Sequence, residues 1–205
     1  MRIVTVCTGN VSRSPLAEYL LRAKLAARGI TEPTVTVSSC GCLRLEPRPM
    51  DRRMAASLTA RGIDPSAYRS TPMTAAEIRD ADVILCFEER HIDRIVDTLP
   101  AAMRHTFLME DFANVCHALA ERGDCPKATP ADSLATILEE GPLLRPLLPP
   151  AEEIADPYHQ PEAVYAEAIR RIDAATSAIV GALVPASSVP ASSGPAPVPV
   201  PAPTR

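Results

Sequence analysis

The sequence predicts an α/β fold in which a four-stranded parallel sheet carries helices on both faces. Short β-branched or apolar runs alternate along the chain with longer segments whose apolar residues recur at helical spacing. One of the short runs is apolar almost throughout, as expected of a strand that is covered on both sides. Such alternation is typical of parallel sheets, because each pair of neighbouring parallel strands needs a crossover connection, usually a helix.

The elements follow one another in a regular order. We predict strands over residues 3–6, 34–38, 81–87 and 105–108, and helices over residues 14–29, 51–61, 88–99 and 162–183. The first helix begins with Ser14, which suits a helix cap, and Pro15, which suits a first turn. Gly62 ends the second helix, and the last helix is long and amphipathic.

The folded domain is predicted over residues 1–184. Within it, residues 109–150 fit the alternation poorly, since two weak helical patterns are followed by four prolines. About 40 residues cannot easily form a core of their own, so this segment is interpreted as a helical insert or lid before the last helix. Residues 185–205 read PASSVPASSGPAPVPVPAPTR, and we expect them to form a disordered or polyproline-II tail.

Composition restricts the class of protein. The chain has 25 acidic and 21 basic side chains, a net charge of −4, which gives no electrostatic case for binding nucleic acid. No apolar run approaches the roughly 20 residues that span a bilayer, and the first residues lack the features of a secretory signal. We therefore expect a soluble, cytoplasmic protein with no membrane partner. Its six cysteines are irregularly spaced and should be thiols there.

The most informative segment is CTGNVSRSP, residues 7–15, between the first strand and the first helix. A parallel sheet places its ligand site at this point, and the backbone N–H groups and helix dipole can hold a tetrahedral oxyanion. Arg13 offers a planar fork for two oxygens of that anion. Cys7, stabilised as a thiolate, would lie below a bound phosphate and attack phosphorus. The loop residues predicted to bind substrate are Thr8, Gly9, Asn10, Val11, Ser12 and Ser14.

Individual side chains of this loop have expected roles. Ser14 can donate its hydroxyl to the Cys7 thiolate when that sulfur leaves phosphorus. Asn10 can cross-brace the loop, and it tolerates left-handed backbone as Gly9 does. The alternative is a buried strand-end cysteine followed by an ordinary Gly-Asn turn.

Residues 6–18, VCTGNVSRSPLAE, resemble the signature of the low-molecular-weight protein tyrosine phosphatases. Residues 38–42 look like the turn that follows the second strand in that family, and the resemblance covers roughly residues 1–110 and 152–184. It implies a flavodoxin-like or Rossmann-like sheet and a phosphomonoester hydrolase that forms a phosphocysteine intermediate without metal or cofactor. The implied partner is a phosphotyrosine protein or another phosphomonoester. Ser12 stands where the family usually has a second cysteine, which implies that a protective disulfide is missing.

The reaction needs a general acid, because the leaving oxygen must be protonated. The residues alone leave several carboxylates in competition, namely Asp82, Glu88, Glu89, Asp93, Glu110, Asp111 and Asp156. Asp156-Pro157-Tyr158 resembles the Asp-Pro-Tyr element of the family, which implies that Asp156 is the acid and that Tyr158 flanks an aromatic substrate. The alternative is an Asp-Pro turn that caps the last helix. His159 replaces a second aromatic residue, which leaves the preference for an aromatic leaving group open.

Two other functions remain open. Gram-positive-type arsenate reductases share this fold and loop, and they carry a resolving cysteine at the position of Cys86. They also need a further thiol a few residues on, and residues 88–93 contain none, so Cys86 is interpreted as strand core. The other alternative is an inactive phosphate-binding adaptor. No metal site is predicted from Cys40, Cys42, Cys116, His117 and Cys125. Cys-x-Cys and Cys-His are poor spacings for one tetrahedral zinc ion, whose ligands usually have two or more residues between them.

Overall fold

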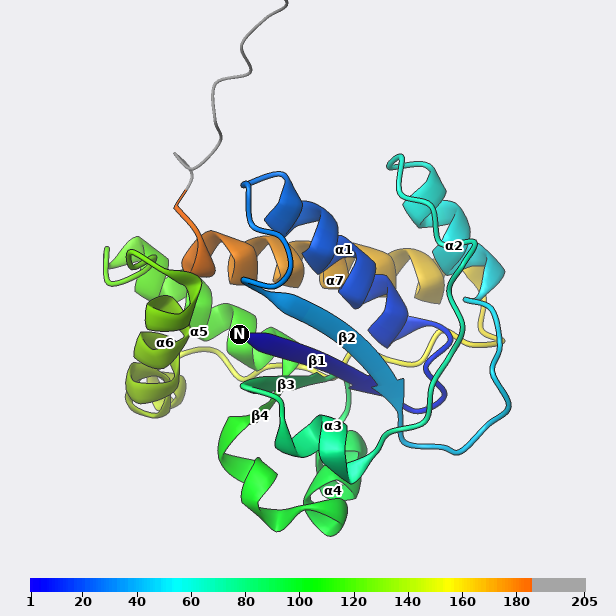
Figure 1. Cartoon of the computed structure of the whole chain (residues 1–205), viewed down its shortest axis with the longest axis horizontal. Coiled ribbons are helices and arrows are strands. Elements are labelled where there is room, and N and C mark those ends of the chain that lie inside the picture. The colour runs from blue at the N-terminus through cyan, green and yellow to red at the C-terminus, as the bar shows by residue number, and fades with distance from the viewer. Residues whose placement is uncertain (186–205) are drawn as a thin grey trace, which may run out of the picture.

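The computed structural model of the chain describes residues 1–185, and it contains the predicted four-stranded sheet, in the order β2-β1-β3-β4 (Figure 1). The strands are β1 (Arg2–Cys7), β2 (Thr36–Gly41), β3 (Val83–Cys86) and β4 (Thr106–Leu108). Each neighbouring pair is parallel. The carboxyl ends of all four strands therefore lie along the same edge of the sheet, on the right in Figure 1.

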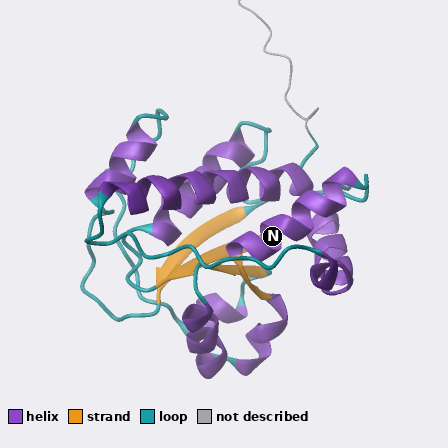
Figure 2. Ribbon diagram, turned by 180° about the vertical axis from the view of Figure 1, so that it is seen from behind, coloured by secondary structure: helices purple, strands orange, loops and turns teal. Residues whose placement is uncertain are grey.

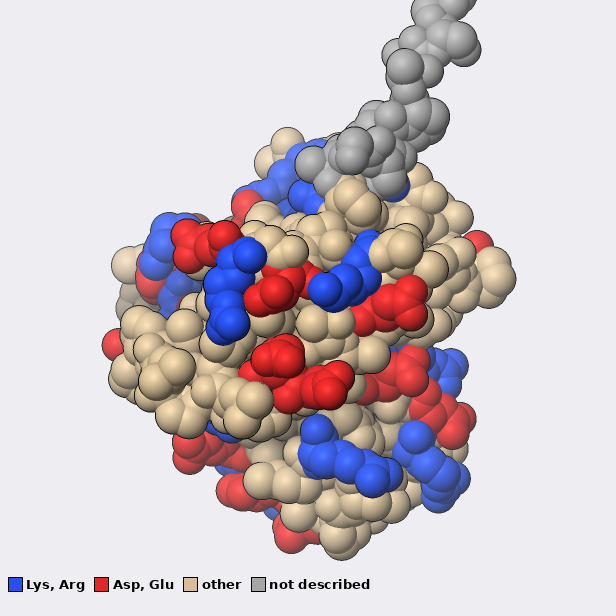
Figure 3. All heavy atoms as spheres, turned by 90° about the vertical axis from the view of Figure 1, so that its left-hand side faces the viewer, with Lys and Arg blue, Asp and Glu red and all other residues tan. Residues whose placement is uncertain are grey.

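Helices cover both faces of the sheet, as predicted (Figure 2). One face carries α1 (Arg13–Ala26), α2 (Arg52–Thr59), α5 (Met109–Glu121) and α7 (Glu162–Leu183), with α6 (Pro130–Leu144) and the 3₁₀ turn η2 (Arg145–Leu147) beside α5. The other face carries α3 (Ala75–Arg79), α4 (Glu89–Thr98) and the 3₁₀ turn η1 (Pro100–His105). At the amino ends of the strands, acidic and basic side chains are interspersed over the surface (Figure 3).

The inner strand β1 shows why helices pack on both faces of the sheet. Its side chains alternate between faces, as they do in any strand. Ile3 packs in the larger core under α1 and α7, whereas Val4 and Val6 pack in the smaller core with α3 and α4. All three side chains are fully buried, which is why the run contains no polar residue at these positions.

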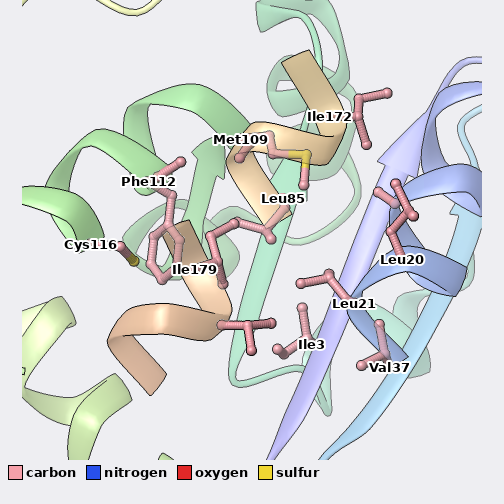
Figure 4. Packing of buried hydrophobic residues seen from close by; sticks show 14 of the residues in the cluster. Ile3, Leu20, Leu21, Val37, Leu85, Met109, Phe112, Cys116, Ile172 and Ile179 are labelled. Atoms are coloured by element: carbon pink, nitrogen blue, oxygen red, sulfur yellow. The ribbon is translucent and has the colours of Figure 1, made fainter. Parts of the chain in front are cut away.

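Residues 109–150 are helical, as predicted, and their first helix belongs to the larger core. Met109, Phe112 and Cys116 of α5 are buried and contact the sheet and α7 (Figure 4). Ile172 and Ile179 of α7 point into the same cluster. The helix α5 is therefore an integral support of α7, and α6 packs outside it.

Some boundaries differ from the sequence-based expectation. The second strand was predicted over residues 34–38 but runs from Thr36 to Gly41, because Cys40 and Gly41 pair with Val6 and Cys7 of β1. The helix α3 and the turn η1 were not predicted at all. The predicted tail, apart from Pro185, lies outside the described residues. In the described part of the chain, no helix combines the length and apolarity needed to cross a membrane.

Candidate active site

Residues 7–14, hereafter the Cys7 loop, connect the end of β1 to the first turn of α1. Asn10 has a positive φ of 54° and turns the loop back on itself. Its side-chain Nδ2 donates to Ser14 Oγ at 2.9 Å and to Ser39 Oγ at 2.8 Å, and its Oδ1 accepts from the backbone N of Thr71 at 2.8 Å. Tyr68 donates its hydroxyl to the Asn10 carbonyl at 2.7 Å. These hydrogen bonds, all buried except the partly buried one from Thr71, fix the loop to β2 and to the segment after α2.

The Cys7 sulfur receives a hydrogen bond from Ser14, whose Oγ lies 3.0 Å from Cys7 Sγ. Because Asn10 already donates to Ser14 Oγ, the serine hydroxyl hydrogen is left to point at the sulfur. Cys7 is buried at 3% exposure, beneath the loop. The arrangement suits a sulfur that carries negative charge, since a hydroxyl donor stabilises a thiolate more than a thiol.

Arg13 is completely buried under the loop. Its Nη1 donates to Glu88 Oε2 and to the carbonyl of Ile154, both at 2.7 Å. Its Nη2 lies 3.0 Å from Asp156 Oδ2 as an ion pair. Within residues 1–185, Nε and Nη2 have no hydrogen-bond partner, so two donors of the guanidinium remain for an anion.

Glu88 supplies the negative charge that Arg13 needs in this buried place. Its Oε2 accepts from Arg13 and, at 2.8 Å, from Arg90 Nη2, and it lies 3.3 Å from His91 Nε2. Burial alone would raise the pKa of Glu88, but the hydrogen bonds from Arg90 and Arg13 and the positive charge of Arg13 outweigh it and lower that pKa. Glu88 is therefore a positioning carboxylate for Arg13, whereas the sequence left it among the candidate acids.

His91 links α4 to the Cys7 loop. It is 2% exposed, and its Nε2 lies 3.0 Å from Thr8 Oγ1. Burial, together with the charge of Arg13, lowers the pKa of His91 to about 4. The ring is therefore neutral at physiological pH. Sequence reasoning missed this residue, because its place beside the loop depends on the pairing of β3 with β1, which no local pattern of residues shows.

A pocket of about 130 Å³ opens above Cys7, at the carboxyl edge of the sheet. Its lining from the loop is Cys7, Thr8, Gly9, Val11 and Ser12, and its mouth is formed by Leu43, Leu45, Arg48, Asp156 and Tyr158. The predicted loop residues and the predicted acid thus meet at one pocket, while Asn10, Arg13 and Ser14 support it from below. The three mouth residues from positions 43–48 were missed, because exposed side chains in a loop carry no periodicity.

The remaining candidate acids lie elsewhere or have other partners. Asp82 accepts from the backbone N of Arg2 at 2.7 Å, at the opposite end of β1. Glu110 and Asp111 form ion pairs with Arg171 and Arg145. Asp156 alone among the predicted carboxylates lines the Cys7 pocket, and 33% of its side chain is exposed there.

The sequence model of the low molecular weight phosphotyrosine protein phosphatase family matches residues 2–139, which is more than half of the chain. The chain belongs to this family. The predicted family and class of enzyme are therefore confirmed. The matched region contains the Cys7 loop, Glu88 and His91 but ends before Asp156, so the assignment of the acid depends on the geometry of the pocket.

Two curated relatives of this phosphatase differ in their stated substrates. The low molecular weight protein-tyrosine-phosphatase Etp of Escherichia coli (strain K12) is 34% identical over 106 residues, covering 52% of this chain and 67% of the relative. A protein-arginine-phosphatase of Geobacillus stearothermophilus is 34% identical over 113 residues, covering 55% of this chain and 72% of the relative. A solved arginine phosphatase structure from that organism superposes with a TM-score of 0.63 at 26% identity, covering 87% of this chain and 90% of that one.

The other cysteines of the phosphatase lie outside the pocket. Cys86 is fully buried in the smaller core, on the other face of the sheet from the larger core that contains Cys7. Burial raises the pKa of the Cys86 thiol well above its ordinary value, so Cys86 is an inert core residue, as the sequence analysis interprets it. Among residues 1–185, no three histidine, cysteine or carboxylate side chains are grouped to hold a metal ion.

Proposed function

We propose that this chain is a protein-tyrosine phosphatase that works through a phosphocysteine intermediate on Cys7. One observation carries the proposal: Cys7 Sγ lies at the base of a pocket, 3.0 Å from a hydroxyl donor, while the only predicted acid at the mouth pairs with Arg13. Nucleophile, anion-binding guanidinium and acid thus meet at one pocket, and in-line transfer needs the thiolate and the acid on opposite sides of phosphorus with the guanidinium at its equatorial oxygens.

In the first step the Cys7 thiolate attacks phosphorus, and the bond from phosphorus to the ester oxygen breaks. Asp156 gives its proton to that oxygen, so the substrate leaves as a neutral hydroxyl compound. Arg13 and the loop N–H groups hold the equatorial oxygens and stabilise their charge in the transition state. The products of this step are cysteinyl phosphate and ionised Asp156.

In the second step water attacks the phosphorus of the cysteinyl phosphate. Asp156 takes one proton from the water, the bond from sulfur to phosphorus breaks, and the electron pair returns to Cys7 Sγ. Ser14, 3.0 Å away, stabilises the departing thiolate. Inorganic phosphate leaves, and the starting protonation of the enzyme is restored.

The pocket favours an aromatic leaving group. Val11, Leu43 and Leu45 contribute apolar surface to the pocket above the buried sulfur, and Tyr158 contributes an aromatic ring to the same lining. His159, which replaces an aromatic residue, packs on Tyr158 with ring centroids 4.0 Å apart and so supports that ring. A phosphoserine side chain has no ring to fill the space beside this apolar surface.

Phosphoarginine is the second candidate substrate, because one relative is a protein-arginine-phosphatase. Its guanidinium would need acceptors along the wall, where Asp156 is the only carboxylate lining the pocket. Turnover of phosphotyrosine and phosphoarginine peptides, compared under the same conditions, decides between them. A higher kcat/KM for the phosphoarginine peptide would reverse the ranking.

The free thiols support a cytoplasmic site of action. All six cysteines of the described residues are unpaired. A nucleophilic Cys7 needs a reducing compartment to stay reduced, and Ser12 offers it no disulfide partner within the loop.

The decisive experiment combines two variants and a control. Cys7→Ser should abolish hydrolysis of p-nitrophenyl phosphate in EDTA, because a serine hydroxyl is not ionised there. Asp156→Ala should lose about 10²–10⁴ in kcat on phenyl phosphate but far less on 2,4-dinitrophenyl phosphate, whose phenoxide leaves unaided. Asp93→Ala, which removes an exposed carboxylate of α4, is the control and should change neither. Full activity in Cys7→Ser would refute the proposal. An inactive wild-type protein would also refute it and would favour the alternative of an inactive phosphate-binding adaptor.

A further inference from the structure

The segment that carries Asp156 has no helix or strand to hold it. Residues 151–157, hereafter the acid segment, form no regular structure between η2 and α7. On the inner side, Ile154 donates its N–H to the Phe87 carbonyl at 2.9 Å and accepts from Arg13 at 2.7 Å. Glu153 accepts from the backbone N of Glu89 at 2.7 Å. These bonds tie the acid segment to the end of β3 and to the Cys7 loop.

A second guanidinium holds the acid segment from its outer side. Arg171 of α7 donates through Nη1 to the Glu153 carbonyl and through Nη2 to the Glu152 carbonyl, both at 3.1 Å. Arg171 is itself fixed by Glu110 of α5, whose two carboxylate oxygens accept from Nε and Nη2 at 2.5 Å each. This two-pronged pair is poorly exposed, at 15% for Arg171 and 22% for Glu110.

We propose that Arg171 and Glu110 are positioning residues for Asp156, and that α5 thereby sets the geometry of the acid. The inference rests on the proposed function, since it assigns these residues to the acid of that reaction. With Arg13 on one side and Arg171 on the other, the backbone just before Asp156 is fixed at three consecutive residues. Loosening one side lets the carboxylate drift, and a displacement of about 1 Å can cost roughly 10²-fold in rate.

The chain provides a matched control beside this pair. Glu167 and Arg170 of α7 form the same two-pronged contact, at 2.9 and 2.6 Å, and they line the same surface groove between α5 and α7. They are exposed and have no hydrogen bond to the acid segment. Glu167→Gln therefore removes a similar ion pair from the same surface, while the hydrogen bonds of Arg171 to Glu110 and to the acid segment, hereafter the clamp, stay in place.

The test measures how each variant depends on the leaving group. In Glu110→Gln and Arg171→Met, the ratio of kcat on phenyl phosphate to kcat on 2,4-dinitrophenyl phosphate should fall about tenfold, because only the poor leaving group needs a well-placed acid. Glu167→Gln should keep the wild-type ratio. Equal losses on both esters, or an unchanged ratio in both clamp variants, would overturn the inference.

Amide hydrogen exchange provides a readout that does not depend on catalysis. Exchange at residues 152–156 should accelerate in Glu110→Gln and Arg171→Met but not in Glu167→Gln. Unchanged protection in both clamp variants would overturn the inference even in an active enzyme. If the wild-type protein hydrolyses neither ester, the proposed function fails, while the exchange data still decide whether the clamp exists. Glu110→Gln retains the shape of the side chain and serves if Arg171→Met does not fold.

Discussion

Lowering the pH from 7 to 5 should destabilise the fold through His91, and His91→Gln should remove that part of the loss. The ring is buried between the Cys7 loop and α4, where it faces the charges of Arg13, Glu88 and Arg90. Burial, aided by the cation of Arg13, keeps the folded ring neutral down to a pKa of about 4. Glutamine can keep the contact to Thr8 but cannot take up the proton.

The sign and the size of this loss of stability follow from the difference in proton uptake between the folded and the unfolded chain. An unfolded histidine binds its proton near pH 6.5, whereas the folded one binds it near pH 4. Between these values the unfolded chain holds more protons, so the free energy of unfolding falls as the pH falls. For these two pKa values the loss of unfolding free energy between pH 7 and pH 5 is about 2 kcal/mol.

Urea unfolding at both pH values measures the effect. Other groups, among them His105, whose pKa is also lowered by burial, titrate in wild type and variant alike. The informative quantity is therefore the difference between the two proteins in their loss of stability. His117→Gln, at an exposed histidine of α5, checks the effect of the substitution itself. If wild type and His91→Gln lose the same free energy between pH 7 and pH 5, the reasoning is refuted.

Three further substitutions probe the loop. Gly41→Ala would place a Cβ 3.0 Å from backbone and Cβ atoms of Asn10, so we expect the loop to shift and kcat/KM to fall about tenfold or more in steady-state assays. Asn10→Ala removes the three side-chain hydrogen bonds of a fully buried residue and should lower the free energy of unfolding by about 1–3 kcal/mol in urea titrations. Ser14→Ala should slow breakdown of the phosphoenzyme more than its formation, giving a larger burst of phenol in rapid-quench experiments. A burst smaller than that of wild type would place Ser14 in the first step.

The order of the elements was predictable because their patterns are long or dense in apolar residues. The last helix has the predicted bounds, and its buried residues recur at helical spacing over 22 residues. By contrast, α3 has five residues, too few for any period to show. The end of β2 was missed because Cys40 and Gly41 have weak strand propensity on their own, and pairing with β1 decides their conformation.

The part of the site that residue spacing predicts is contiguous in sequence, whereas Asp156 and Tyr158 were predicted from the resemblance to the phosphatase family. Cys7, Arg13 and Ser14 belong to one loop, whose spacing and place between a strand and a helix start indicate an anion site. Glu88 and His91 acquire their roles from the register of β3 on β1, which brings Cys86 beside Val6 and so places the next turn against the loop. No local pattern contains that register. The contact of Arg171 with the acid segment is likewise set by the packing of α7 on α5.

The buried Arg13 also bears on how the protein is made. Its Nη1 needs the carbonyl of Ile154, which lies 141 residues further along the chain. During synthesis the loop leaves the ribosome before residue 154, and its guanidinium lacks this acceptor until that residue has followed. A buried donor without an acceptor costs about 1–3 kcal/mol, so the nascent loop has no stable native arrangement of its own. The Cys7 loop therefore cannot complete its native hydrogen bonds until residue 154 has left the ribosome, although it is the earlier of the two segments.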